Sequence, residues 1–186
     1  PGVTVTDEGW HAVGMAATGS VEVLFTEAAA IAVGHPGDYL SRPGFWQGGI
    51  GIAACWYGAA QRLAEVLREQ CAKRPEPHAL AHLGAVDSAL NAAACVLRAS
   101  AEHIDREPKA DARALAQRTR ACIEDTVTQV MHHVGRAVGA GPYCKDPHFA
   151  QLMADLPVYL RQSHAERDLA GLGELVAGEP TGRWQL

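Results

Sequence analysis

The 186-residue sequence lacks features that mark several classes of protein. Aromatic residues make up only 6% of it, and no basic stripe with interleaved aromatic side chains is present, so nucleic acid is not an expected partner. The amino terminus has no series of basic, apolar and small residues typical of a signal peptide. It begins "PGVTVTDEGW", without an initiator methionine. We therefore expect a fragment or a processed product of a longer protein.

Long apolar runs are also scarce. The uncharged run at residues 44–60 contains five glycines and Gln47. Spanning a bilayer takes about 20 predominantly apolar residues, whereas this run is shorter and continues directly into the polar "QRLAEVLRE". We therefore expect a buried, closely packed helix here and no membrane partner.

No C-x-x-C pair occurs among the cysteines. They stand far apart in an alanine-rich helical context, which favours reduced thiols in a cytoplasmic protein. No cysteine–histidine pair has the spacing of a closed zinc site, and the adjacent His132 and His133 would point about 100° apart on a helix. We therefore expect no bound metal. The cysteines are Cys55, Cys71, Cys95, Cys122 and Cys144.

The composition that remains is that of a globular domain. Hydrophobic residues make up 48%, charged residues 20%, and the net charge is −5. Residues 1–35 contain "VTVT" and "SVEVLF" between glycines, a pattern typical of short strands and turns. Two to four short strands do not form a stable sheet alone. We interpret residues 1–35 as the last strands of a β domain whose remainder is missing, and residues 36–44 as a Gly/Pro linker.

Helical periodicity dominates the rest of the chain. Residues 45–71 predict a first helix, which "KRPEP" ends. The second and third helices carry apolar positions spaced alternately by three and four residues, and the third ends in "GAGP". The fourth begins with Asp146 as N-cap and Pro147 at its first position, runs through Leu160, and is followed by a tail or a short fifth helix. The positions on these two helix faces are Leu83, Val86, Leu90, Ala93, Leu97, Ser100 and Ile104, then Ile123, Val127, Val130, Val134 and Ala137; all but Ser100 are apolar.

This pattern predicts a mainly α protein. Its core is an antiparallel four-helix bundle at residues 45–176, preceded by the small β-strand remnant and followed by a tail at residues 177–186. Small residues dominate the first helix, so we expect a neighbouring backbone to approach it closely.

Four motifs in this order resemble those of acyl-CoA dehydrogenases. "WHAVGMAATGSVEVLFTEAAA", residues 10–30, resembles the close of that family's middle β domain, with its G-M-x-A-T-x-S-like turn. Arg42-Pro43, Gly51 and "REQCA" resemble the first helix of its carboxy-terminal domain. "AVGAGPYCKDP", residues 137–147, resembles its G-G-x-G-Y turn, and "LMADLPVYLRQ" resembles the helix that begins at its R-D dipeptide. The resemblance covers essentially the whole chain and implies the carboxy-terminal half of such a flavoprotein.

The resemblance also implies a cofactor and a substrate. FAD is implied between the β domain and the bundle, partly bound by a neighbouring subunit, and Arg42 is implied to approach an acyl-CoA or similar small molecule. Arg68 and Gln70 match residues that reach the FAD diphosphate, a task that suits a guanidinium fork. Gly139 and Gly141 could let a backbone approach the cofactor, although a glycine helix stop is the simpler account. A homo-oligomer, dimer or tetramer, is expected through the bundle.

The sequence departs from the family at the proton-abstracting glutamate. Eight residues after Asp155, where most members keep it, lies Ser163, and the branched-chain position immediately before Arg42 is Ser41. Serine lacks the basicity to take such a proton unaided. The family's G-Y tyrosine, R-D arginine and R-x-Q-F phenylalanine are also replaced, by Pro142, Ala154 and Cys71.

Three neighbouring residues are therefore the catalytic candidates: Ser163, His164 and Glu166. His164 sits beside the family's base position, and an imidazole can shuttle protons near neutral pH. Glu166 takes this role if the alignment shifts by a few positions. The alternative is a solvated helix face with i,i+4 pairs such as His164–Asp168.

The resemblance favours one function, and two alternatives to it remain open on the sequence alone. The first is an FAD-dependent dehydrogenase that oxidises a carbon–carbon bond of an acyl-CoA, with the fragment itself inactive. The second is a flavin-dependent monooxygenase or oxidase on the same fold, favoured by Ser41 and Ser163. The third is a non-catalytic bundle kept for oligomerisation.

Overall fold

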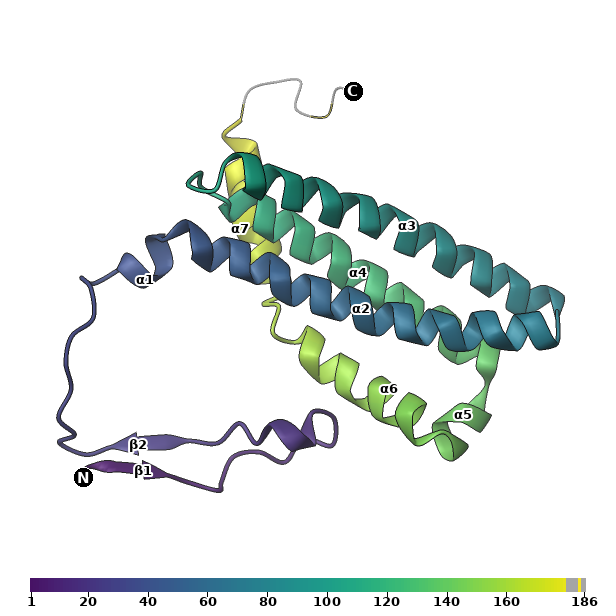
Figure 1. The fold of residues 1–186 in the computed structure, drawn as a ribbon, viewed down its shortest axis with the longest axis horizontal. Helices are drawn as coiled ribbons and strands as arrows, with labels where there is room; N and C mark the ends of the chain where they lie inside the picture. Colours follow the sequence, from purple (N-terminus) through teal and green to yellow (C-terminus); the bar gives the residue numbers. More distant parts are fainter. Residues whose placement is uncertain (180–183, 185–186) are drawn as a thin grey trace.

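The computed structural model describes residues 1–179 and 184, so part of the predicted tail at 177–186 lies outside the described residues. Three long helices form the body: α2 (Pro43–Lys73), α3 (Pro77–Arg106) and α4 (Arg113–Val138). Figure 1 shows them side by side, with α2 and α3 antiparallel across their short connection. The predicted mainly α bundle is confirmed.

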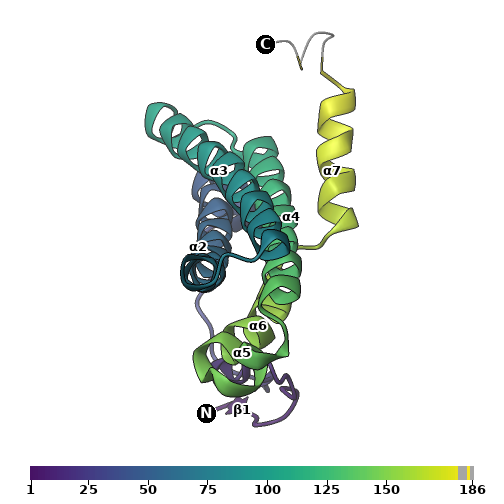
Figure 2. The ribbon, with the colours of Figure 1, turned by 90° about the vertical axis from the view of Figure 1, so that its right-hand side faces the viewer.

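Two shorter helices complete the bundle. The first, α6 (Pro147–Leu160), packs on α2, and the second, α7 (Glu166–Ala177), packs on α4. Figure 2 shows α7 standing to one side of α4, away from α2. Of the two expectations for the stretch after Leu160, a short fifth helix is therefore the one that forms.

The helix starts follow from their capping residues. Proline occupies the first turn of α2, α3 and α6, where its missing N–H costs nothing. Asp146 accepts hydrogen bonds from the backbone N–H groups of His148 (3.0 Å) and Phe149 (3.1 Å), so the predicted N-cap is confirmed. Glu76 caps α3 in the same way through Ala79 N–H at 2.9 Å.

The core lies where α2 and α4 meet. From α2 it takes small and large residues in alternation, including Ala53, Trp56 and Ala60, all fully buried. The alanines let α4 approach closely, as the small-residue pattern predicts, and Val127 and Val130 fill the facing positions. The largest fully buried side chains are Trp56, Leu63, Leu67, Ile123, Leu156, Val86, Val127, Val130 and Val134.

Helix α3 covers this core from outside. Among the described helices it alone is long and apolar enough, by length and composition, to cross a membrane. A single helix of this kind is weak evidence for a membrane, and the predicted apolar positions Leu83, Leu90 and Leu97 pack against the bundle core. Polar contacts also join α3 to α4: the hydroxyls of Ser100 and Thr119 lie 2.8 Å apart in the buried interface.

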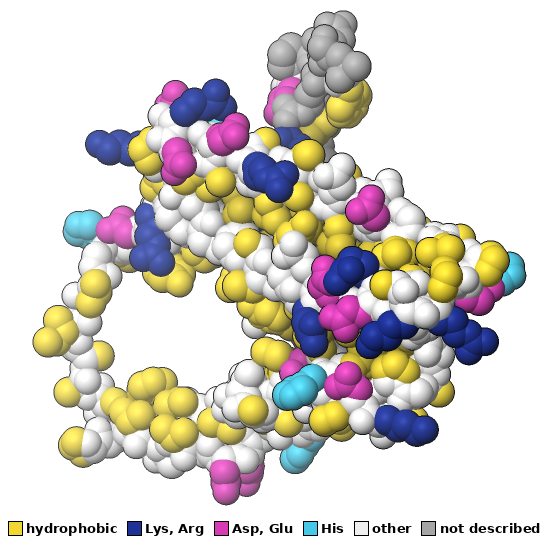
Figure 3. Space-filling view, turned by 45° about the vertical axis from the view of Figure 1, so that its right-hand side comes forward, with side chains coloured by type: hydrophobic (Ala, Val, Ile, Leu, Met, Phe, Trp, Pro, Cys, Tyr) yellow, Lys and Arg dark blue, Asp and Glu magenta, His cyan; other side chains and the backbone are white. Residues whose placement is uncertain are grey.

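The first 35 residues form a thin ribbon beside the bundle. It contains an antiparallel pair, β1 (Val3–Val5) and β2 (Val23–Phe25), with a 3-10 turn (Ala16–Thr18) between them. Its large apolar side chains face solvent, with Ile31 92% and Val33 96% exposed. Figure 3 shows a wide opening between this ribbon and the helices. Such a two-stranded pair is marginal on its own, as a β remnant would be.

The ribbon is anchored to the bundle at one turn. Met15 N–H donates to the carboxylate of Asp155 on α6, which also accepts from Gln151 Nε2 at 2.7 Å. Gly14 lies so close to α6 that a Cβ there would sit 1.8 Å from the carbonyl oxygen of Ala154. The G-M-x-A-T turn and the helix of the R-D motif, 140 residues apart in sequence, thus meet directly.

Two segments differ from the sequence-based expectation. The "GAGP" region is not a simple turn, because after Gly139 (φ 67°) the chain forms a short helix, α5 (Ala140–Lys145). The predicted linker at 36–44 contains a one-turn helix, α1 (Asp38–Ser41), and already includes the start of α2. The helices α1 and α5 and the first residues of α2 are too short to show a periodic pattern of apolar residues in the sequence.

Replacing Gly14 by alanine should detach the ribbon. The new Cβ meets a backbone oxygen, so residues 10–20 must shift and the Met15–Asp155 hydrogen bond is lost, at a cost of roughly 1–3 kcal/mol. Amide hydrogen exchange should become faster in residues 10–20. Gly48→Ala is the matched control, since nothing lies within 4 Å of its added Cβ. Equal exchange in the two variants would contradict the anchor.

The bundle should lose stability on mild acidification. The Nδ1 atoms of His82 and His133 lie 2.9 Å apart between α3 and α4, so a hydrogen bond requires one neutral ring. Burial, followed by His82, His132 and Arg136, lowers the pKa of His133 below its ordinary value of 6.5. Because the unfolded chain then binds more protons, the free energy of unfolding falls as pH drops below about 6.5.

Urea unfolding at pH 7.5 and 5.5 measures this effect. The midpoint should fall at pH 5.5 in the wild type, and His133→Asn should reduce the difference. His11→Asn, a substitution in the ribbon, is the control and should leave the difference between the two midpoints unchanged. A wild-type midpoint independent of pH across this range would refute the prediction.

Candidate functional site

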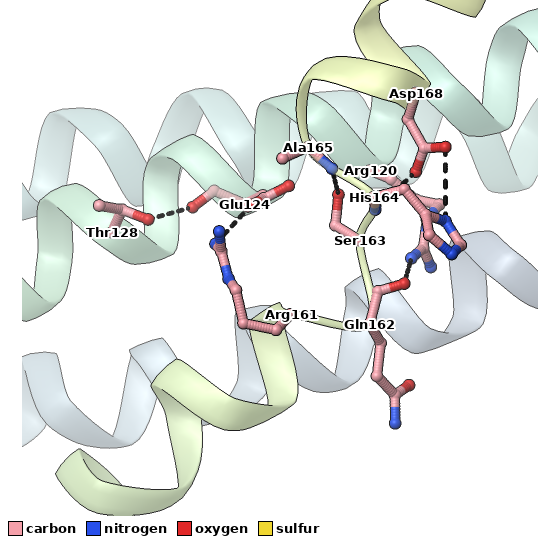
Figure 4. Close-up of polar contacts among 9 residues, drawn as sticks. All are labelled: Arg120, Glu124, Thr128, Arg161, Gln162, Ser163, His164, Ala165 and Asp168. Atoms are coloured by element: carbon pink, nitrogen blue, oxygen red, sulfur yellow. Dashed lines mark hydrogen bonds and ion pairs between the residues drawn. The ribbon is translucent and has the colours of Figure 1, made fainter.

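The predicted catalytic corner is the five-residue connection from α6 to α7, residues 161–165. Successive backbone hydrogen bonds close the end of α6, from Arg161 N–H to Val158 and from Ser163 N–H to Leu160. Ala165 then reverses the chain with φ 45° and ψ −116°, a conformation that non-glycine residues rarely adopt. Figure 4 shows this connection lying against α4.

His164 and Asp168 form a pair across the start of α7. The backbone N–H of His164 donates to Asp168 Oδ2 at 3.1 Å, and its Nδ1 lies 3.6 Å from Asp168 Oδ1 (Figure 4). The imidazole is 65% exposed, whereas the carboxylate is 31% exposed. Asp168 therefore holds the backbone of His164 by a hydrogen bond and lies beside its ring, at a distance longer than a hydrogen bond.

The two other catalytic candidates differ from His164 in their surroundings. Ser163 is buried, and its Oγ accepts a hydrogen bond from Ala165 N–H at 3.3 Å, which stabilises the turn. Glu166 is exposed in the first turn of α7. The structure directs these neighbours to different sides, because Ser163 and Glu166 line one cavity and His164 lines another. Among the three, His164 is the one with a carboxylate partner in the described contacts.

Arg120 of α4 links this corner to the rest of the bundle, and the sequence did not single it out. Its Nη1 donates to the carbonyl of Gly49 on α2 at 2.9 Å, and its Nη2 donates to the carbonyl of Gln162 at 3.1 Å. The guanidinium carbon also lies 4.7 Å from the ring centroid of Trp56. Burial lowers the pKa of Arg120, while the carboxylates of Asp168 and Glu124 oppose that shift.

Three cavities border the connection. One, of ≈ 430 Å³, lies between the connection and the ribbon. The other two are both lined by Arg120 and Asp168. The first, of ≈ 410 Å³, lies between α4 and α7 and contains Glu124 and Glu166; Glu124 pairs with Arg161 at 2.7 Å. The second, of ≈ 380 Å³, reaches the amino-terminal end of α2. It is lined by Phe45, Trp46, Gly49, Arg120, Gln162, His164, Arg167 and Asp168.

The second cavity combines an aromatic wall with cationic groups. Phe45 and Trp46 pack edge to face, with ring centroids 5.2 Å apart, and the Arg113 guanidinium carbon lies 5.8 Å from the Trp46 ring. Arg113 Nε and Gln117 Oε1, at the start of α4, are buried and have no hydrogen-bond partner among the described residues. Such groups are usually satisfied by a ligand or by water.

The structure separates the other predicted residues into two places. Arg42 and Ser41 lie where α1 meets α2, one turn before the aromatic wall, and the Arg42 guanidinium stacks 4.2 Å from the Tyr39 ring centroid. Arg68 lies 19 residues after Gly49 on α2, which amounts to about 28 Å along the helix axis. The residues around His164 and those around Arg68 therefore do not form one site within a single chain.

The far end of α2 carries the predicted cofactor residues. Arg68 pairs with Glu65 at 2.6 Å, both half exposed, and lines a groove of ≈ 290 Å³ between α2 and α3. Gln70 Nε2 donates to the carbonyl of Ala137 at 3.4 Å, close to the end of α4. Gly139 and Gly141 follow there, and an added Cβ at either position would meet nothing within 4 Å. Neither glycine is required by close packing inside the chain.

The comparisons with known proteins bear on the fold. No family model matches the chain, and neither does any curated protein. The nitrososynthase from Micromonospora carbonacea var. africana superposes with a TM-score of 0.79 at 22% identity, over 96% of this chain and 50% of that chain. KijD3, solved with FMN and a dTDP-amino sugar, gives 0.76 at 20%, over 99% and 51%. XiaF from Streptomyces sp., solved with FADH2 and glycerol, gives 0.72 at 21%, over 95% and 52%.

These neighbours are flavoproteins with the acyl-CoA dehydrogenase fold. The chain spans about half the length of each of them. At such identities the likeness establishes the fold, so the chain has the fold of the carboxy-terminal part of an acyl-CoA-dehydrogenase-like flavoprotein. The resemblance drawn from the sequence is thereby confirmed.

Relieving the backbone strain at Ala165 should stabilise the protein. Glycine adopts φ 45° without a Cβ penalty, so Ala165→Gly should raise the free energy of unfolding by about 1 kcal/mol, whereas Ala165→Val should lower it. Thermal unfolding measures both variants. Ala170→Gly, at an exposed helical position in α7, is the control and should lower stability by about 1 kcal/mol. A lowered midpoint in both glycine variants would mean that Ala165 is not strained.

Proposed function

We propose that this chain is the carboxy-terminal half of a flavin-dependent oxidoreductase, and that the parent protein performs monooxygenase-type chemistry on a small molecule other than an acyl-CoA. The observation that carries the proposal is the His164–Asp168 pair at the corner where the resembling family keeps its glutamate. Histidine side chains can give and take protons near neutral pH. Oxygen-transfer chemistry needs such a proton carrier, and it does not need a base that removes a proton from carbon.

The surroundings of the two serines argue against standard acyl-CoA oxidation. Ser41 is exposed, and its Oγ donates to the carbonyl of Asp38 at 3.4 Å. Ser163 is buried and accepts from the backbone. Neither serine has an adjacent base in its described contacts that would make it a base itself. Glu166 lines the cavity between α4 and α7, not the aromatic-walled one.

The neighbouring structures support the flavin part of the proposal. KijD3 was solved with FMN and a dTDP-amino sugar, XiaF with FADH2, and a third neighbour is a nitrososynthase. These proteins share the fold of this chain at TM-scores of 0.72 to 0.79. A substrate without coenzyme A is therefore compatible with this fold.

The residues of the aromatic-walled cavity suit a planar ring system. Phe45 and Trp46 offer flat apolar surface, and Arg167 and His164 offer donors beside it. When bound, a reduced flavin supplies the electrons that activate dioxygen. The His164 imidazole lies beside the Asp168 carboxylate, at 3.6 Å, and it is proposed to move a proton to or from the substrate.

Oligomerisation completes the proposal. Arg68 and Gln70 lie at the end of α2 away from His164, so they are proposed to serve the flavin of a neighbouring copy, in a dimer or tetramer formed through the bundle.

The exposed apolar residues of the ribbon, such as Ile31 and Val33, require cover from the rest of a β domain. The 186 residues alone are therefore expected to be inactive, and the parent is proposed to be cytoplasmic.

An anaerobic titration of the parent protein tests the proposal. The oxidised flavin band, at roughly 450 nm, should persist when a panel of acyl-CoAs is added without oxygen. Reduced flavin and dioxygen should support substrate oxidation, and His164→Ala should slow it about 10²-fold or more, as expected for loss of a proton-transfer group. His148→Ala, an exposed histidine on α6, is the control and should leave turnover unchanged.

Two results would overturn the proposal. Bleaching of the flavin by an acyl-CoA would show that dehydrogenase chemistry persists with an unconventional base. A colourless parent that binds no flavin would point to a structural, oligomerising role.

A further inference from the structure

We infer that Arg120 is a positioning residue that sets the place of His164 by tying its connection to α2. The inference rests on the proposed function, because it concerns how the proton-carrying group of that site is held. The observations behind it are the contacts of the guanidinium, each of which reaches a different element. Figure 4 shows Arg120 between α4 and the connection, with its hydrogen bond to Gln162.

The first step is the tether itself. Gln162 contributes its backbone carbonyl to Arg120 Nη2 at 3.1 Å, two residues before His164. The same guanidinium donates through Nη1 to the carbonyl of Gly49 at 2.9 Å. One rigid fork therefore joins the connection to the second turn of α2, so that movement of Gln162 away from α2 breaks at least one charge-assisted hydrogen bond.

The second step is the support of Arg120. Its guanidinium carbon lies 4.7 Å from the ring centroid of Trp56, and that ring is fully buried in the bundle core. Trp56 is in turn held edge to face by Tyr159 of α6, at 6.1 Å between centroids. The fork thus rests on one of the largest buried side chains of the bundle, which fixes its plane.

The third step connects the tether to the imidazole. Arg120 and Asp168 line the same two cavities. The Asp168 carboxylate accepts a hydrogen bond from the backbone N–H of His164 at 3.1 Å and lies 3.6 Å from its ring. Arg120 therefore restrains the residue two positions before His164, and Asp168 restrains His164 from the start of α7.

The strained Ala165 makes this restraint necessary. With φ 45° at the following residue, the connection has a locally unfavourable conformation that persists only where surrounding contacts impose it. Ser163 supplies one such contact through its Oγ at 3.3 Å. The fork of Arg120 supplies another, and a lysine, with a single point of donation and no planar face, does not reproduce it.

Arg120→Lys keeps the charge and removes the fork, so it tests the inference directly. In the parent protein, amide exchange of residues 161–169 should become about tenfold faster, because two charge-assisted hydrogen bonds to backbone carbonyls are weakened. Exchange in the middle of α3 should remain unchanged. Arg136→Gln, an exposed position in the last turn of α4, is the control and should leave residues 161–169 protected.

A double-mutant cycle with His164→Ala, measured by turnover, distinguishes a positioning role of Arg120 from a merely structural one. If Arg120 acts through His164, Arg120→Lys slows turnover of the wild type but adds no further loss in the His164→Ala background. A general structural defect would slow both backgrounds by the same factor and would overturn the inference. Unchanged exchange of residues 161–169 in Arg120→Lys would also overturn it.

If the proposed function is wrong but the inference about Arg120 is right, the same variants give a different pattern of results. In that case His164→Ala leaves turnover unchanged or no flavin is bound, while Arg120→Lys still accelerates exchange of residues 161–169. The tether to the connection is then upheld and the proton-carrying role of His164 is refuted.

Discussion

The close packing of α4 on α2 is the contact on which the rest of this structure depends. Alanines at positions 53 and 60 of α2 bring the two backbones together around Trp56, and β-branched side chains of α4 fill the space that remains. Three other helices use this pair as their base: α3 covers both helices, α6 lies on α2 and α7 lies on α4. The corner with His164 exists only because α6 and α7, on different helices of the pair, meet at its edge.

Polar groups sit along this framework at a few defined points. The hydroxyls of Ser100 and Thr119 satisfy each other inside the α3–α4 interface, and the imidazoles of His82 and His133 meet near its other end. Arg120 extends the α2–α4 interface toward the connection through two carbonyls and the Trp56 face. A guanidinium there is only half buried, so it keeps its charge while losing much of its freedom. Arg120 thus contacts both the packed core and the connection that carries His164.

The ribbon at residues 1–35, unlike the bundle, buries few of its apolar side chains. Its apolar side chains face water, and its described attachment to the bundle is centred on Gly14, Met15 and Asp155. A short paired ribbon buries too little surface to be stable without other contacts. Arg68 lies about 28 Å along α2 from Gly49, so the residues near His164 and those near Arg68 belong to different ends of the bundle.

The sequence by itself determined the helices and their buried faces. The spacing of Ile123, Val127, Val130 and Val134 and the Asp146 cap act over one or two turns, and such local signals survive in any tertiary context. It also located the corner at Ser163 and His164, through the order of its motifs. Only the tertiary structure decided the partners: Arg120 reaches Gly49, 71 residues away in the sequence, and His82 meets His133, 51 residues away. Nothing in the local pattern marks such pairs, because they depend on how whole helices cross, and that is set by the summed packing of the core.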